Sequence, residues 1–246
     1  MPLPYRLDAG PAARAAIGLI LLQTDSVAEG EIGAILREPG VGVHHGRIPF
    51  DPAVTPETLA RMGEALPDAA AMLPGDPPLD AVAYCCTSGA TVIGADRVDA
   101  AIAASHPRAA VTDPIRAVLA ALDALGARRI GMLTPYRADV SAALRARLEA
   151  SGFEVAAFGA FEQETDALVA RIAPESVLEG LVEVGRGDVD AVFASCTNLR
   201  TLPIAAQAEA ALGKPVVSSN LALGWRLRVL AGLPIAGAGP GRLFAG

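Results

Sequence analysis

An internal repeat runs through this 246-residue chain. Three short segments of its first half recur in the same order about 110 residues further along, which indicates a duplicated supersecondary unit. The pairs are 17–21 (IGLIL) with 130–134 (IGMLT), 80–88 (DAVAYCCTS) with 190–198 (DAVFASCTN), and 110–114 (AVTDP) with 216–220 (VVSSN). We therefore predict two similar lobes related by an approximate two-fold axis.

Short apolar runs alternate with longer segments of helical character along the chain. This alternation predicts an α/β fold with parallel sheets. The expected strands are Ile17–Leu22, Val41–His45, Ala81–Tyr84, Ala109–Val111, Arg129–Leu133, Glu154–Phe158, Ala191–Ala194 and Pro215–Val217. The clearest expected helices are Thr55–Leu66, Arg116–Leu125, Val140–Ser151 and Glu175–Val184, with Gly126 and Gly152 as helix stops.

Composition excludes several classes of function. The net charge is −7 and aromatic residues make up 4%, whereas nucleic-acid binding usually shows a basic stripe or stacking aromatics, so we expect no nucleic-acid partner. Lys214 is the only lysine and lies in a Gly-Lys-Pro turn, which argues against Schiff-base catalysis. No apolar run reaches the ~18–20 residues of a spanning helix, and no signal peptide is visible. We expect a cytoplasmic protein without a membrane partner.

The chain has three cysteines, Cys85, Cys86 and Cys196. A small, odd number of cysteines does not indicate a disulfide framework. The sequence has no second cysteine pair at ligand spacing, so we expect no zinc site. Cys86 and Cys196 occupy equivalent places in the repeat, each at the end of an apolar strand. Ligands bind at such strand ends in α/β sheets, and a following helix would lower the thiol pKa from ~8.5.

Two thiols that face one cleft suit a reaction without metal or cofactor. One can remove a proton from a carbon acid while the other protonates the opposite face, or a thiolate can add to an activated double bond and leave again. The residues that follow the cysteines supply donors for a carboxylate or enolate oxygen. These are Thr87, Ser88, Thr197 and Asn198. Strand alternation turns Cys85 to the other face, so we expect it to be a core residue.

The chain resembles the aspartate/glutamate racemase superfamily, in the branch of maleate cis-trans isomerase and arylmalonate decarboxylase. The resemblance covers nearly the whole chain. It rests on Ile17-Gly-Leu-Ile with Asp25 and Glu29 beyond it, on Cys86-Thr-Ser-Gly and Cys196-Thr-Asn-Leu, and on Thr134-Pro-Tyr136. The stretches that begin at the two cysteines look closest to the ectoine-utilisation protein A group.

The resemblance implies two flavodoxin-like lobes with the active site between them. We place the first lobe at 1–112 with 213–246, and the second at 113–212. It also implies that Cys86 is the nucleophile, that Cys196 donates a proton from the opposite side, and that Tyr136 binds a substrate carboxylate. Relatives of this kind are usually dimers or tetramers, so a homo-oligomer is expected.

The chain departs from the maleate isomerase pattern at two carboxylate-binding asparagines. Asp25 stands where those enzymes carry the first, and an aspartate there would repel a substrate carboxylate unless it is protonated. The second is expected after the Phe158 strand, where the sequence reads Phe161-Glu-Gln-Glu-Thr-Asp166 and Gln163 is the candidate substitute. Both changes favour a substrate with a positive or donor group.

The leading hypothesis is therefore a cofactor-independent isomerase or racemase of a small carboxylate, either a maleate-like dicarboxylate or an amino-acid derivative. An arylmalonate-type decarboxylase is a second reading, because that reaction needs only one cysteine to protonate a planar enediolate. A small-molecule binding protein on the same scaffold is a third. The sequence leaves the substrate and its stereochemistry open.

Overall fold

A computed structural model describes residues 1–51 and 54–245 as two four-stranded parallel sheets. The strand orders are β2-β1-β3-β4 and β6-β5-β7-β8. The order is the same in both sheets, which confirms the duplicated α/β fold. The strands are β1 (Ala15–Leu22), β2 (Val41–Ile48), β3 (Ala81–Tyr84), β4 (Ala110–Thr112), β5 (Arg129–Tyr136), β6 (Glu154–Gln163), β7 (Ala191–Ala194) and β8 (Val216–Ser218).

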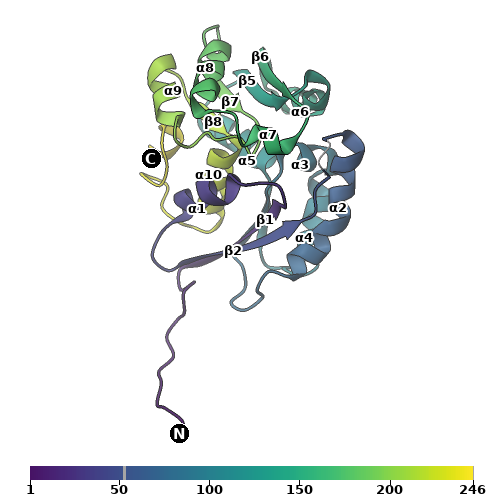
Figure 1. Ribbon diagram of the computed structural model, residues 1–246. Helices are drawn as coiled ribbons and strands as arrows, with labels where there is room; N and C mark the ends of the chain where they lie inside the picture. The colour runs from purple at the N-terminus through teal and green to yellow at the C-terminus, as the bar shows by residue number, and fades with distance from the viewer. Residues whose placement is uncertain (52–53, 246) are drawn as a thin grey trace.

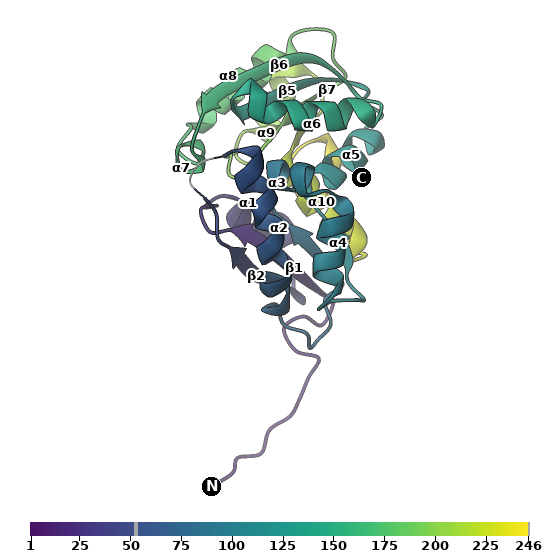
Figure 2. The same cartoon turned by 90° about the vertical axis from the view of Figure 1, so that its right-hand side faces the viewer.

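Helices pack on both sheets and between them, as Figures 1 and 2 show from two directions. Figure 1 shows α5 and α10 in the region between the two sheets. The helices are α1 (Ala28–Leu36), α2 (Pro56–Ala71), α3 (Thr87–Ile93), α4 (Ala95–Ala103), α5 (Pro114–Ala124), α6 (Ala138–Ala150), α7 (Asp166–Val169), α8 (Pro174–Gly185), α9 (Ala205–Leu212) and α10 (Ser219–Leu230), with a 3-10 turn at Arg242–Phe244.

The two lobes exchange their last helices. α5 follows β4 of the first sheet and contacts β8 of the second, while α10 follows β8 and packs on α1, β3 and α5. The predicted lobe boundary at residue 213 is therefore corrected, because Val216–Ser218 pairs with β7 inside the second sheet and the chain returns to the first lobe only with α10. This exchange brings the carboxyl ends of both sheets toward each other.

Local sequence explains how several elements begin. The Thr55 hydroxyl and Thr58 form a reciprocal capping box at the start of α2, and Pro56 occupies its first turn. The repeated glycines of β1 and β5 allow close packing: a Cβ on Gly18 would lie 2.8 Å from Leu73 Cδ1, and one on Gly131 would lie 2.3 Å from the Val184 carbonyl oxygen. Both glycines of the repeat therefore serve the packing of neighbouring segments.

All eight expected strands and all four expected helices are present. Several strands run further than expected, β2 to Ile48, β5 to Tyr136 and β6 to Gln163, because the pairing of β2 with β1 and of β5 with β6 continues past the apolar runs. In the described part of the chain, no helix is both long and apolar enough to cross a membrane.

Candidate active site

Cys86 lies two residues beyond the end of β3 and forms the N-cap of α3. Its Sγ accepts a hydrogen bond from the Gly89 amide at 3.3 Å, as a side-chain oxygen does at other helix starts. Gly89 is required here, because a Cβ at that position would lie 2.4 Å from the Tyr84 hydroxyl and 3.0 Å from the Cys86 Sγ. Cys86 is 7% exposed. The start of α3 thus holds the sulfur in a buried position.

Cys196 occupies the equivalent place after β7 but is held differently. Its φ is +113°, a conformation that costs free energy in any residue but glycine and that often marks a functional site. Its amide donates to the Ser219 hydroxyl at 3.1 Å, and its Sγ lies 3.5 Å from the Tyr136 hydroxyl. The expected helix does not follow directly, because α9 begins at Ala205. The helix-terminus prediction is therefore right for Cys86 and wrong for Cys196.

The expectation of lowered thiol pKa values is corrected. Burial raises the pKa of Cys86 to about 12, although the Gly89 amide and a hydrogen bond with Tyr84 act in the other direction. Burial also raises the pKa of Cys196 well above its ordinary value, with the charge of Asp166 as a further cause and the Tyr136 hydroxyl opposing it. Desolvation outweighs the helix terminus because the thiolate has lost nearly all contact with water.

Asp166 is the centre of a polar cluster beside Cys196. Its carboxylate accepts hydrogen bonds from the Tyr136 hydroxyl (2.8 Å), the Thr24 hydroxyl (2.7 Å) and the Asn198 amide (3.0 Å). Asn198 also accepts a bond from the backbone amide of Ser26 at 3.0 Å. The cluster joins the loop after β1 to the second lobe. It also fixes the Tyr136 hydroxyl next to the second thiol.

Asp25 is buried in the same region, with 3% of its surface exposed. Oδ1 accepts the amides of Val27 and Ala28 at 2.9 and 2.8 Å and so caps the start of α1. Among the described residues, Oδ2 has no hydrogen-bond partner. Burial raises the pKa of Asp25, and the Asp166 charge adds to this, while the amide bonds and the nearby Thr197 hydroxyl lower it.

Hydroxyl groups connect the two cysteine loops. Thr87 and Ser219 are hydrogen-bonded through their side-chain oxygens at 2.8 Å, and Ser219 also accepts the Cys196 amide. The Thr197 hydroxyl donates to the Cys85 carbonyl at 3.3 Å. These bonds cross between lobes, so the relative position of the two thiols is set by buried contacts.

A second buried network lies behind the site, around Glu31 of α1. Its carboxylate accepts the amides of Thr201 and Leu202, both at 2.8 Å, and the Asn220 side-chain amide at 2.9 Å. Asn220 also donates to the Thr197 carbonyl at 2.8 Å. This network ties α1 and α10 to the loop that follows Cys196.

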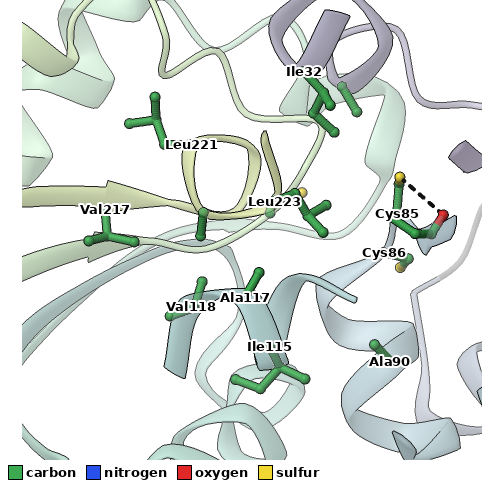
Figure 3. Close-up of a cluster of buried hydrophobic side chains, with 14 of the residues drawn as sticks. Ile32, Cys85, Cys86, Ala90, Ile115, Ala117, Val118, Val217, Leu221 and Leu223 are labelled. Atoms are coloured by element: carbon green, nitrogen blue, oxygen red, sulfur yellow. Dashed lines mark hydrogen bonds between the residues drawn. The ribbon is translucent and has the colours of Figure 1, made fainter. Parts of the chain in front are cut away.

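Ser88, Gln163 and Cys85 are the other residues that the sequence singled out. Ser88 is half-buried in the first turn of α3. Gln163 donates to the Phe161 carbonyl at 2.8 Å, within its own strand, and its role as a substrate-binding residue stays a prediction. Cys85 is fully buried with its thiol 3.6 Å from the Ala83 carbonyl, and Figure 3 shows its sulfur on the opposite side of the chain from that of Cys86. Its prediction as a core residue is confirmed.

The sequence reasoning missed Asp166, Thr24 and Ser219 as members of the site. Thr24 precedes Asp25, and Ser219 lies in the third pair of the repeat, so position in the sequence could have indicated both. Asp166 had a weaker signal, since it lies three residues beyond the end of β6. In residues 1–51 and 54–245, no group of three or more His, Cys, Asp and Glu side chains is arranged to hold a metal ion.

Two matching parallel sheets, each with a buried cysteine after its third strand in sequence, define an enzyme of the Asp/Glu racemase-like class. Within that class, the chain belongs to the arylmalonate decarboxylase family, whose model matches residues 66–244.

Maleate isomerases are among the relatives of the chain. The Nocardia farcinica maleate isomerase is 30% identical over 239 residues, which are 93% of this chain and 94% of the relative. The crystal structure of maleate isomerase Iso from Pseudomonas putida S16 has a TM-score of 0.86 at 25% identity and covers 94% of this chain and 98% of that one. A cysteine-to-serine variant of the Nocardia farcinica maleate cis-trans isomerase, with a covalently bound succinylcysteine intermediate, has a TM-score of 0.85 at 28% identity, with coverage of 94% and 98%. The likeness to the ectoine-utilisation group stays a prediction.

Proposed function

We propose that the chain is a cofactor-independent isomerase of a small carboxylate in which Cys86 and Cys196 act from opposite sides of the substrate. The observation that carries this proposal is the pair of buried thiols at equivalent strand ends, tied together through Ser219. Cys86 is the nucleophile or base, and Cys196 is the proton donor. Tyr136 lies 3.5 Å from the Cys196 sulfur, and because its hydroxyl donates its proton to Asp166, its oxygen can accept the Cys196 S–H and hold that thiol in place.

The pair supports a balanced addition and elimination on an alkene diacid. The Cys86 thiolate adds to one alkene carbon, and Cys196 gives its proton to the neighbouring carbon. The new carbon–carbon single bond rotates, the proton returns, and the carbon–sulfur bond breaks to release the trans isomer. The succinylcysteine in the Nocardia farcinica enzyme is the adduct that such an addition produces there.

The same two thiols support proton transfer on a saturated carbon acid. One thiolate removes a proton, the bonding electrons pass into the adjacent carboxylate as an enediolate, and the opposite thiol protonates the other face. Backbone and hydroxyl donors near the cysteines stabilise the enediolate oxygens. The addition and elimination route returns both cysteines to their starting protonation, whereas proton transfer leaves thiol and thiolate exchanged until the solvent restores them. Neither route needs a redox partner.

Decarboxylation of a malonate-like acid is the second candidate, favoured by the family model that matches residues 66–244. This reaction forms the same kind of enediolate, but it needs one thiol to protonate it. The presence of a cysteine in both repeats favours isomerisation. Release of carbon dioxide would decide for decarboxylation.

Proton NMR in deuterium oxide tests the proposal on a panel that includes maleate, aspartate, glutamate, hydroxyaspartate, diaminobutyrate derivatives and substituted malonates. Wild type is compared with Cys86→Ser and Cys196→Ser, and Cys85→Ser is the matched control, since Cys85 faces the core. We expect conversion or deuterium entry to be lost by about a hundredfold or more in the first two variants only. Full activity in either would contradict the proposal.

The proposal also covers the cellular location and the oligomeric state of the enzyme. Three free thiols suit the reducing cytoplasm, where cysteines persist without pairing, and we place the activity there. We also propose a homodimer or homotetramer, as expected from the resemblance. Light scattering of the purified chain measures its mass in solution and would contradict this if it gave 25.0 kDa.

A further inference from the structure

The backbone of Cys196 is strained, whereas that of its counterpart Cys86 is not. Cys196 has a φ of +113°, and Cys86, at the matching strand end, has an ordinary extended value of −148°. A residue other than glycine keeps such a conformation only where the surrounding structure holds it. The loop after Cys196 is therefore expected to have supporting contacts that the loop after Cys86 does not need.

Asn220 of α10 makes such a contact. Its side-chain amide donates to the Thr197 carbonyl oxygen at 2.8 Å and to Glu31 Oε2 at 2.9 Å. The repeat pairs Asn220 with Pro114, whose side chain has no hydrogen-bonding group. The first lobe therefore cannot make this contact from the matching position, in agreement with the unstrained backbone of its cysteine.

Glu31 of α1 holds the Asn220 side chain in its orientation. Its Oε1 accepts the Thr201 and Leu202 amides, both at 2.8 Å, and its Oε2 accepts the Asn220 amide together with the Thr201 hydroxyl at 3.1 Å. Glu31 and Asn220 are 7% and 1% exposed. Among the described residues, the Asn220 Oδ1 atom has no hydrogen-bond partner, so the two bonds that the amide donates are the ones that fix it.

The Thr197 carbonyl belongs to the same peptide unit as the Asn198 N–H. A peptide unit is planar, so a bond that holds its carbonyl also sets the direction of its N–H. Burial raises the pKa of the Cys196 thiol, and the Asn198 amide is among the groups that lower it, because it donates to the sulfur. Asn220 thus acts on the second sulfur through the backbone.

Both supporting side chains come from the lobe that carries Cys86. α1 follows the first strand of that lobe, and α10 packs against α1 after the chain has returned to it (Figure 1). We propose that Glu31 and Asn220 are positioning residues that hold the loop after Cys196 and so aim its thiol at the substrate from the side opposite Cys86. This inference rests on the proposed function and adds two residues that act through the backbone of the second cysteine.

Two variants remove this support in different ways. In Glu31→Gln, Oε1 can still accept the two backbone amides, while an NH2 group replaces the acceptor of Asn220. Asn220→Ala removes the donor itself. Glu209→Gln is the matched control, since Glu209 is a buried glutamate of α9 whose Oε1 accepts the Val216 amide at 2.9 Å, at the start of β8 and so at the strand end opposite the site.

Steady-state kinetics on the substrate that the panel identifies provide the first readout. A loop that aims the thiol affects the reacting geometry more than the binding of the substrate. We expect Glu31→Gln and Asn220→Ala to lower kcat by about tenfold or more and to keep KM within about threefold, while Glu209→Gln keeps both. An unchanged kcat, a loss carried by KM, or an equal loss in Glu209→Gln would overturn the inference.

Hydrogen exchange followed by peptide mass spectrometry provides a second readout, which needs no substrate. We expect the amides of 196–198 to exchange at least about tenfold faster in Glu31→Gln and Asn220→Ala, and those of 86–89 to keep their rate. An unchanged rate at 196–198 would overturn the inference, and so would equal acceleration of both segments, which reports a general loosening of the fold. The proposed function fails separately, as unchanged turnover when either Cys86 or Cys196 is replaced by serine.

Discussion

The thiol of Cys86 should resist ionisation in the ligand-free protein. Burial raises its pKa from an ordinary value of 9.0 to about 12. This difference corresponds to about 4 kcal/mol against the thiolate, so at pH 8 roughly 0.01% of Cys86 is ionised, compared with about 10% of an exposed thiol. The helix terminus and the Gly89 amide alone would have given the opposite expectation.

The assay is alkylation of Cys86 by iodoacetamide between pH 7 and pH 10.5, followed by peptide mass spectrometry. Cys85→Ala is used throughout because the two adjacent cysteines share a peptide. Steric protection slows the reaction at every pH, so the diagnostic is the slope rather than the absolute rate. We expect the rate to rise about tenfold per pH unit without a plateau.

A plateau with a midpoint at or below pH 9 would refute the reasoning that desolvation dominates the pKa of this thiol. Asp25→Asn in the same background provides an internal comparison. Because the Asp25 charge is one of the causes that raise the Cys86 pKa, its removal should increase the alkylation rate at each pH. An unchanged rate would show that the carboxylate does not act on the thiol.

Three further predictions concern the site and its stability. In Gly89→Ala the new Cβ would lie 2.4 Å from the Tyr84 hydroxyl, so turnover should fall by about tenfold or more. Gly63→Ala is the control, since its Cβ would have its nearest contact at 3.4 Å, and it should keep its turnover. Equal turnover of the two variants in steady-state assays would contradict this. Ser219→Ala leaves the buried Cys196 amide unpaired and should lower the free energy of unfolding by about 1–3 kcal/mol in urea titrations; a loss below about 0.5 kcal/mol would count against it. The unfolded state loses the Cys86 proton first as the pH rises above 9, so the free energy of unfolding should fall by up to about 1.4 kcal/mol per pH unit for this thiol. Cys86→Ser should reduce that slope, and an identical slope in both proteins would be the contrary result.

The repeat was sufficient to predict the two sheets, because buried parallel strands are short apolar runs whose ends carry the polar residues. It also placed Cys86 and Cys196 at matching strand ends. The repeat could not show that the loops after them differ, with α3 starting at Thr87 but α9 only at Ala205. In the second lobe the Ser219 hydroxyl of α10 accepts the Cys196 amide, a contact from another helix that the repeat does not indicate.

The burial of the thiols was likewise beyond the sequence. Contacts between segments that lie apart in the chain are not visible in a local pattern, as in the hydrogen bond that Met62 of α2 accepts from the Tyr84 hydroxyl 22 residues away. Asp166 was missed for a similar reason: it begins α7, and its partners Asn198 and Thr24 lie far from it in the chain. Contacts between the lobes bring the charged residues of this site together, and local sequence patterns do not reveal such contacts.

The central claim is that two thiols act on opposite faces of one substrate. Its most direct test is the stereochemistry of deuterium entry in deuterium oxide, for the substrate that the panel identifies, in Cys86→Ser and Cys196→Ser. The account predicts that both variants lose net conversion by about a hundredfold or more and that any residual exchange occurs at opposite faces in the two variants. Net conversion preserved in either variant, or exchange at the same face in both, would contradict it.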